Sequence, residues 1–406
     1  MTDKDIPETF GAQGAAAQTP YDVAVVGAGP AGLALALGLS GRGVSTILVT
    51  GPDRGADHRT TALLDGSVKI LQDFGLWDRI ADKAAPRRDM RIVDATRRLV
   101  RAPEVAFRSA EIGLDAFGYN ITNDDLRLAF LKAAEESPAL ALARTSLVGL
   151  APGAGAMDLT LADGRTLSAR LVVGADGRSS KVREASGIAM RHRDYPQVAF
   201  TATVRHRRHH EDTSTEFHTE SGPFTLVPLP GERSSVVCVV SDREAVRLLG
   251  MSDTELAREL EERAFSLLGA FEMEPGRGAF PLAAEAAERL VAPRVALMGE
   301  AAHIMPPIGA QGLNLGLRDA AALVDLVAMA VAHGGDPGDE GLLQRYAAGR
   351  KRDIEGRMAA VDLLNRSLLS GLVPVQSVRG FGLYLLDRVG PLRRAVMRLG
   401  VGGRAA

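Results

Sequence analysis

Apolar runs near the start of the chain predict a strand, a turn, a helix and a second strand. Val23 to Val26 are all apolar, which is typical of a strand buried on both faces. A glycine-rich turn follows, then an apolar stretch of helical length, and a second apolar run ends near Thr50. This order is that of a βαβ unit.

Two later segments repeat the change from strand to turn to helix. Leu171 to Val173 indicate a buried strand, followed by the turn Gly-Ala-Asp-Gly and the start of a helix. In "RVALMGEAAH" a strand reaches Gly299 and Glu300, and after a loop with two prolines a long helix begins near Gln311.

Between about 190 and 285 the apolar period changes to two. This alternation predicts antiparallel strands, with turns at Ser221-Gly222-Pro223 and at Pro230-Gly231. Phe217 and Phe224 lie in this region. They are candidates for an aromatic substrate pocket, with plain core packing as the alternative.

Composition narrows the class of protein. The 406 residues are 46% hydrophobic and 24% charged, as in ordinary globular proteins, and the net charge of −2 gives no reason to expect nucleic acid binding. Cys238 is the only cysteine, so any redox chemistry needs a bound cofactor rather than a dithiol pair. Residues 1–20 are polar and favour a disordered leader over a secretory signal. No run approaches the roughly 20 apolar residues of a membrane span.

The first glycine-rich turn has the spacing GxGxxG. Gly27 allows a tight turn, Gly29 lets the backbone approach a pyrophosphate, and Gly32 allows close packing of helix on strand. The free N–H groups at the helix start can then bind phosphates. The second strand ends in Thr50, where an acidic residue usually holds a ribose hydroxyl; Asp53 either substitutes for it or is an ordinary loop acid.

The two later turns also carry candidate chemistry. Asp176 can accept hydrogen bonds from a ribose or order its own loop, and Arg178, Lys181 and Arg183 supply positive charge beside phosphates, unless this is simply a solvated basic turn. The helix that begins near Gln311 offers unpaired N–H donors and a positive dipole end to an anion on a phosphate or on a flavin ring.

Three ordered motifs resemble the fingerprints of the group A FAD-dependent aromatic hydroxylases, the family with the para-hydroxybenzoate hydroxylase fold. They are GxGxxG at 27–32, GADGxxSxVR at 174–183 and GEAAHxxPPxGxQGxN at 299–314. The resemblance covers roughly residues 20 to 400. Within the family, segments 58–80 and 118–134 are similar to the ubiquinone-biosynthesis hydroxylases of the UbiH/VisC kind.

The resemblance implies a set of cofactor contacts. Arg59 matches an arginine at the FAD diphosphate, Asn123 a polar flavin contact, and Glu300 a contact to ribityl or ribose hydroxyls, although most relatives have Asp there. Gly309 to Asn314 match the loop at the pyrimidine edge of the flavin. The implied FAD contacts are Gly27, Gly29, Ala31, Gly32, Arg59, Asn123, Asp176, Glu300, Gly309, Gln311, Gly312, Leu313 and Asn314.

The implied catalytic loop contains Pro307, whose carbonyl would face the substrate, together with Gly309 and His303. From the residues alone, His303 is either a general base or a satisfied structural histidine. The histidine-rich stretch 205–213 suggests a metal only weakly, and a solvated hairpin tip is the alternative. We therefore expect no metal site.

The family fold is α/β with an α+β insert. We expect a discontinuous Rossmann-like FAD-binding domain at 21–80, 119–188 and 288–366. An antiparallel-sheet substrate domain at 81–118 and 189–287 interrupts it. C-terminal helices follow.

The basic segment 367–406 has six arginines against one acid, Asp387, a net charge of +5. Interleaved with apolar residues, it is either a basic amphipathic helix on an anionic membrane or a packing helix with a solvated face. The chain is expected to be cytoplasmic, with contact at the inner face of the membrane and with other ubiquinone-biosynthesis proteins.

The reaction that the resemblance implies is hydroxylation of a phenolic, polyprenylated ubiquinone precursor by O2 through a flavin C4a-hydroperoxide. The reductant is NAD(P)H or a protein electron donor, because no second nucleotide-binding unit is visible. Two alternatives stay open: a flavin-dependent reductase or dehydrogenase of an isoprenoid, and a flavin-binding assembly subunit of a quinone-synthesis complex.

Overall fold

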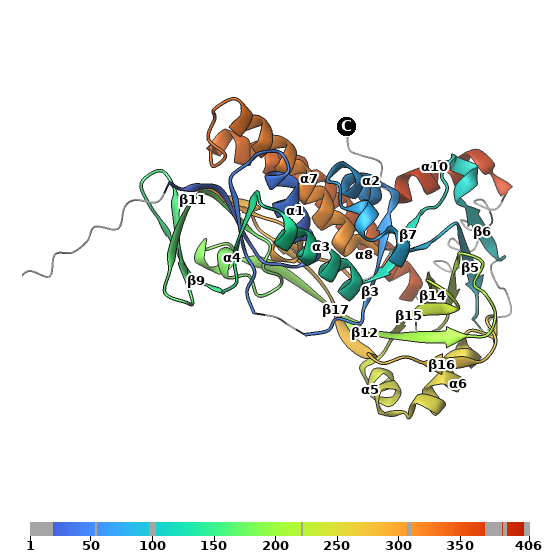
Figure 1. The fold of residues 1–406 in the computed structure, drawn as a ribbon. Helices are drawn as coiled ribbons and strands as arrows, with labels where there is room; N and C mark the ends of the chain where they lie inside the picture. The colour runs from blue at the N-terminus through green and yellow to red at the C-terminus, as the bar shows by residue number, and fades with distance from the viewer. Residues whose placement is uncertain are drawn as a thin grey trace, which may run out of the picture.

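A computed structural model of the chain describes residues 19–52, 55–96, 103–220, 222–306, 310–369, 384 and 388–401. For 363–369 only the helical backbone is described. The expected leader at 1–20 lies almost entirely outside these ranges. Figure 1 shows an elongated molecule with two sheet regions and a helical layer between and above them.

The first sheet has a core of five parallel strands in the order β19-β11-β1-β2-β8. Parallel sheets are covered on both faces, which explains the continuous apolar runs of these strands. An antiparallel edge strand, β18 (Val291–Ala292), and a two-strand extension, β9 (Leu147–Pro152) with β10 (Met157–Leu161), complete it. The core strands are β1 (Tyr21–Val26), β2 (Thr46–Val49), β8 (Leu140–Ala143), β11 (Thr166–Gly174) and β19 (Val295–Leu297).

Long helices pack beside this sheet. Helix α1 contacts both α3 and α7, and α7 contacts α8 (Figure 1). Their bounds are α1 (Pro30–Ser40), α3 (Asn123–Glu136), α4 (Lys181–Ala185), α7 (Gln311–Ala332) and α8 (Glu340–Leu369). Side chains from sheet and helices merge into one large apolar core.

A small sheet joins the two halves of the molecule. It has the order β3-β7-β4, and helix α2 follows β3 directly. The elements are β3 (Thr60–Leu64), α2 (Asp65–Asp73), β4 (Ala85–Pro86) and β7 (Gly118–Thr122), with the short 3-10 helices η1 (Trp77–Arg79) and η2 (Ala81–Lys83).

The third sheet has nine strands and is antiparallel except where β5 pairs with β13. It takes strands from both segments of the expected substrate domain, although that division of domains stays a prediction. Its path is β20-β17-β12-β15-β14-β13-β5-β6, with β16 paired to β12. The strands are β5 (Asp89–Asp94), β6 (Val105–Arg108), β12 (Met190–His206), β13 (Thr213–His218), β14 (Pro223–Leu229), β15 (Arg233–Val240), β16 (Phe271–Met273), β17 (Gly278–Ala287) and β20 (His303–Ile304).

Period-two alternation gives this sheet two different faces. One face packs on helices α5 (Asp242–Gly250) and α6 (Asp253–Arg263) through a core that includes Phe200, Phe217 and Phe224. The other face lines a cavity. Phe217 and Phe224 are therefore core residues and not pocket residues.

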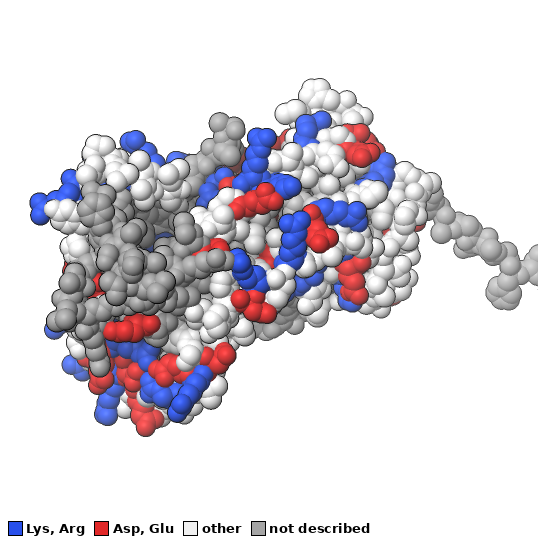
Figure 2. Space-filling model, turned by 180° about the vertical axis from the view of Figure 1, so that it is seen from behind, with Lys and Arg blue, Asp and Glu red and all other residues white. Residues whose placement is uncertain are grey.

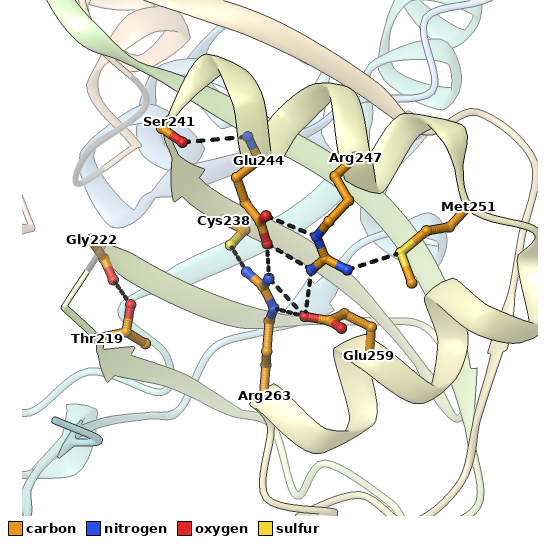
Figure 3. Close-up of polar contacts among 9 residues, drawn as sticks. All are labelled: Thr219, Gly222, Cys238, Ser241, Glu244, Arg247, Met251, Glu259 and Arg263. Atoms are coloured by element: carbon orange, nitrogen blue, oxygen red, sulfur yellow. Dashed lines mark hydrogen bonds and ion pairs between the residues drawn. The ribbon is translucent and has the colours of Figure 1, made fainter. Parts of the chain in front are cut away.

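Charged side chains fasten the two helices to each other and to the sheet (Figure 3). Glu244 of α5 accepts hydrogen bonds from Arg247 and from Arg263 of α6, and Glu259 accepts from the same two arginines. These hydrogen bonds lower the pKa of Glu244 to about 2. Arg263 also approaches the buried Cys238 sulfur at 3.4 Å, which leaves that thiol behind the sheet and away from the cavity.

The C-terminal segment is described only in part. The 3-10 helices η3 (Ser109–Ile112) and η4 (Gly299–Ala301) precede it in the chain. Met397 of α10 (Gly390–Gly400) and Val401, which follows the helix, pack with Val105, Phe107 and Phe117. One face of α10 is therefore a packing face. Across the described ranges, no helix combines the length and the apolar character needed to cross a bilayer.

Candidate functional site

A cavity of about 1620 Å³ runs from the first sheet to the inner face of the nine-stranded sheet. It is larger than the roughly 300–1,000 Å³ of a usual small-molecule site. One end is lined by the glycine-rich turn after β1 and the other by apolar side chains of β5, β12, β15 and β17. The space can therefore hold a dinucleotide and a second, apolar molecule.

The first glycine turn fits a pyrophosphate. A Cβ on Gly27, whose φ is +116°, would lie 2.3 Å from the Ala175 carbonyl oxygen, and one on Gly32 would lie 2.1 Å from the Gly27 oxygen. Gly29 has no heavy atom within 4 Å of such a Cβ and lines the cavity. Gly27 and Gly32 are thus needed for close packing, whereas Gly29 leaves the backbone open to a ligand. Ala31, also in the cavity wall, lies in the first turn of α1, where N–H groups have no intrahelical partner.

A second helix N-terminus opens on the same cavity. Gln311, Gly312 and Leu313 of α7 line it, and no side chain caps the helix at Ala310, which has a left-handed backbone with φ +56°. A Cβ on Gly316 would come within 3.1 Å of the Ala31 Cβ, so small residues bring α1 and α7 together. Two positive helix ends therefore face one space.

Arg59 and Asn123 lie together in the cavity wall. Arg59 donates to both carboxylate oxygens of Asp57 at 2.7 and 2.6 Å and stacks over the Phe280 ring, 5.0 Å from its centre. The Asn123 amide donates to Asp57 at 2.9 Å and accepts from Thr61 at 2.7 Å. Burial opposes ionisation of Asp57, but these hydrogen bonds outweigh it and lower its pKa.

Asp176 lines the cavity and orders the loop after β11. Its Oδ2 accepts the backbone amides of Lys181 (2.7 Å) and Val182 (3.2 Å) at the start of α4. The expected cluster of positive charge is only partly present. Arg178 and Lys181 line the cavity, but Arg183 instead donates to the Ala301 carbonyl at 3.0 Å and ties α4 to the second loop.

Thr50 and Glu300 both line the cavity, and their contacts to cofactor hydroxyl groups stay a prediction. Thr50 follows the last residue of β2, and its hydroxyl makes only long contacts of 3.3 and 3.5 Å to carbonyl oxygens. Glu300 is exposed in η4. The pKa of Arg59 is raised by its hydrogen bond to Asp57 and, to a smaller extent, by the negative charge of Glu300. Asp53 lies outside the described residues.

His303 is buried and lies within hydrogen-bond distance of a carboxylate. Its Nε2 lies 2.7 Å from Oδ2 of Asp319, which also accepts the Gly299 amide at 3.0 Å, while Oδ1 of Asp319 accepts from Arg350 at 2.6 Å. His303 does not belong to the described cavity lining, whereas its neighbour Ile304 does. Its Nδ1 is buried and has no hydrogen-bond partner among the described residues, so His303 is only partly satisfied and its role stays a prediction.

Asn314 also has structural contacts. Its Oδ1 accepts the Leu64 amide at 2.8 Å and its Nδ2 donates to the Ala62 carbonyl at 2.8 Å, which pins β3 to the first turn of α7. The side chain is buried and lies outside the lining of the large cavity, among the described residues. Pro307 and Gly309 lie outside the described ranges, and their role stays a prediction.

Several polar residues in the cavity were not expected from the sequence. Ser214, Glu216 and His218 alternate along the cavity face of β13, and the buried Arg87 follows β4. The strand β13 reads TSTEFH, with polar residues on both faces, so period two alone could not have indicated the first three. The histidine stretch was also misinterpreted: His206 and His210 are buried and hydrogen-bonded rather than solvated.

The face of the molecule seen in Figure 2 shows no large patch of one charge among the described residues. Basic and acidic side chains are interleaved over it. Such a mixed surface, with a net charge of −2, is not that of a nucleic-acid-binding face.

Fold and cavity together define a dinucleotide-binding flavoprotein, and the chain belongs to the FAD binding domain family, whose sequence profile matches residues 20–360. It is 36% identical to the ubiquinone hydroxylase UbiL of Rhodospirillum rubrum, an alignment that covers 98% of this chain and 93% of that protein. It is 31% identical to the 3-demethoxyubiquinol 3-hydroxylase of Escherichia coli, covering 94% and 99% of the two chains.

Solved structures agree in fold. The p-nitrophenol 4-monooxygenase PnpA of Pseudomonas putida superposes with a TM-score of 0.78 at 19% identity, covering 95% of this chain and 99% of that one. HpxO of Klebsiella pneumoniae, complexed with FAD, superposes at 0.73 with 18% identity, covering 94% and 98%. The expected α/β fold with a Rossmann-like FAD-binding region is confirmed, and the chain is a FAD-dependent monooxygenase of the hydroxylase type.

Proposed function

We propose that this monooxygenase hydroxylates the aromatic ring of a phenolic, polyprenylated precursor of ubiquinone. The observation that carries the proposal is the single cavity that joins two helix N-termini to an apolar sheet face. The names of the relatives, ubiquinone hydroxylase UbiL and 3-demethoxyubiquinol 3-hydroxylase, supply the substrate class.

The cofactor residues divide by their chemistry. Gly29 and the free amides of α1 suit the diphosphate, with Arg59 as a positive charge and Asp176 as the residue that orders the facing loop. Glu300 suits a hydroxyl of the ribityl chain or ribose. Gly312 and its neighbours at the start of α7 suit the pyrimidine edge of the flavin, where the helix dipole stabilises negative charge.

Reduced FAD supplies activation of dioxygen, one atom of which enters the ring while the other leaves as water. NAD(P)H or a protein donor supplies the two electrons. The part of the protein is to bind and orient the ring and to exclude water. Val227, Val237, Val239 and Leu282 on the sheet provide the apolar wall that does so.

The substrate class also suggests contact with a membrane surface. Leu392, Val396 and Leu399 are spaced by four and three residues on α10, so they share one face, and all three are exposed. Arg394 and Arg398 are exposed beside them, which is the composition of a helix that lies on anionic lipid. Val396 also lines the cavity, so a prenyl chain leaving the bilayer would enter beside α10. Docking with other ubiquinone-biosynthesis proteins in the cytoplasm is compatible with the same face.

Isotopically labelled dioxygen tests the reaction. Purified enzyme with FAD, NAD(P)H or a ferredoxin system, and prenylated phenols should form a product that carries one labelled oxygen atom. Deletion of the gene should cause an unhydroxylated quinone precursor to accumulate, as seen by mass spectrometry. Reduction of the substrate without label, or normal quinone levels in the deletion strain, would contradict the proposal.

Liposome flotation tests the membrane contact. Leu399→Asp should weaken binding to vesicles that contain anionic lipid, because Leu399 is 79% exposed on α10. Val246→Asp is the matched control, since Val246 is 70% exposed but lies on α5, behind the nine-stranded sheet. Equal binding of both variants and wild type would refute a role of α10.

A further inference from the structure

Arg87 is a buried charge in the cavity wall. It follows β4, only 8% of its surface is exposed, and it lines the same space as Met90 and Phe117. Its backbone is fixed by hydrogen bonds to Gly118 and from Phe117 at 2.8 Å each. The side chain is thus held at the sheet end of the cavity, among apolar groups.

Among the described residues, the guanidinium of Arg87 forms no ion pair. Its Nε has no hydrogen-bond partner among the described residues, and no carboxylate in those residues comes within 4.0 Å to form an ion pair. Burial lowers the pKa of Arg87 to about 10, so the group still carries its charge at neutral pH. A buried charge without a partner is unfavourable unless something else occupies the position opposite it.

Among the described residues, Glu216 is the acidic residue whose charge raises the pKa of Arg87, and it has another partner. Its charge counteracts the effect of burial on Arg87, yet its Oε1 lies 2.8 Å from Nε2 of His218. Both Glu216 and His218 face the cavity from β13. At the sheet end of the cavity, Arg87 therefore presents a buried guanidinium whose Nε has no partner among the described residues.

We propose that Arg87 binds an anionic oxygen on the aromatic ring of the substrate and so determines which rings enter the cavity. The inference deepens the proposed function and rests on it, because it gives the ring a charged oxygen, either a phenolate or a carboxylate. A guanidinium offers planar, charged donors that suit either group. Holding a phenol as its phenolate would also make the ring richer in electrons.

Binding of simple aromatic probes to the FAD-loaded enzyme tests the inference. The probes are 4-nitrophenol with its methyl ether 4-nitroanisole, and benzoate with neutral benzamide, each titrated by calorimetry. Wild type should prefer an anionic probe to its neutral partner. If 4-nitrophenol is the preferred one, its coloured phenolate form should appear in the complex below the pH at which it forms in solution; preference for benzoate would identify the carboxylate.

Three variants make the test specific. Arg87→Met should weaken the preferred anion at least tenfold (about 1.4 kcal/mol) and leave the neutral probe within about twofold. Arg87→Lys should restore part of the affinity. Arg88→Met is the matched control, because the Arg88 side chain is 57% exposed, pairs with Asp212 and lies outside the described cavity lining.

Stability provides an independent readout. If the guanidinium is unpaired in the free enzyme, Arg87→Met should melt at or above the temperature of wild type. A variant that fails to fold or melts well below wild type would overturn the inference, as would equal anion binding by wild type and Arg87→Met. If the enzyme incorporates labelled oxygen but Arg87→Met binds the anionic probe as well as wild type does, only this inference is refuted. If Arg87→Met loses anion binding but the enzyme incorporates no labelled oxygen, only the proposed reaction is refuted.

Discussion

The buried aspartate of α7 allows a quantitative test of how the second loop is held. Asp319 is fully buried and accepts the Gly299 amide, His303 and Arg350. Replacement by asparagine keeps the shape and removes the charge. His303 and Arg350 then lose the anion to which both are paired.

The expected loss of stability follows from the partners that remain. Removing one member of a buried charge network typically costs about 3–5 kcal/mol. Arg350 keeps Asp353 at 2.7 Å, so we expect the lower end, about 3 kcal/mol. The η4 turn, which presents Glu300 to the cavity, also loses a firm anchor at Gly299. We expect FAD affinity to fall about tenfold, or about 1.4 kcal/mol.

Urea unfolding of the apoprotein measures the first quantity, and fluorescence titration with FAD measures the second. The apoprotein is essential because bound FAD itself adds stability by mass action. Asp325→Asn is the control, since Asp325 lies on the same helix but is 53% exposed, and its pair with Arg42 is worth about 0–1 kcal/mol. If Asp319→Asn costs no more than Asp325→Asn, the network does not hold the loop.

The lowered pKa of Asp319 predicts how the stability of the protein changes with pH. Burial opposes ionisation of Asp319, but the positive charges of His303 and Arg350 outweigh it and lower its pKa below the usual 3.8. The unfolded chain therefore binds a proton more readily than the folded chain at this site. The stabilisation is complete above pH 3.8 and is lost as the pH falls through the lower folded value. The gap between wild type and Asp319→Asn should narrow in that range.

Three further substitutions have distinct expected outcomes. Gly27→Ala should destabilise the apoprotein severely, by more than about 3 kcal/mol, whereas Gly29→Ala should leave unfolding unchanged and weaken FAD binding; equal effects on both would contradict the packing argument. Arg263→Met should cost about 1–2 kcal/mol in urea at neutral pH. Part of that cost comes from Glu244, whose contribution to stability is present above pH 4.5 and is lost on acidification towards pH 2. A cost of Arg263→Met that stays constant over this pH range would contradict the reasoning. Gly316→Val should separate α1 from α7 and lower FAD content; full FAD loading would refute that.

The glycine motifs were predictable because their causes are local. The spacing at 27–32 shows directly where a chain turns and where a helix starts, and the structure starts α1 at Pro30. The start of α7 at Gln311 is also confirmed. Both follow from the order of apolar runs and breakers, which needs no knowledge of distant residues.

Roles set by distant partners were not predictable in the same way. Arg183 was expected beside phosphates. It instead donates to the carbonyl of Ala301, which belongs to the third motif, at 299–314. His303 lies against Asp319 of α7, which also accepts from Arg350 of α8, and these two helices pack together in the fold. Arg87 and Arg88 are neighbouring residues of the same type, so the sequence does not distinguish them. The Arg87 backbone bonds to Phe117 and Gly118 and its side chain is buried, whereas the Arg88 side chain is exposed and pairs with Asp212.

The two glycine-rich loops form one site because two long helices meet at their small residues. Ala31 in the first turn of α1 lies against Gly316 in the second turn of α7, nearly three hundred residues later. This contact brings both helix N-termini to the same cavity, one beside Gly29 and the other beside Gly312. Asp319 lies one turn further along α7 and holds Gly299 and His303. The helix that presents free amides to the cavity thus also holds the loop before it, so loss of either function should impair the other.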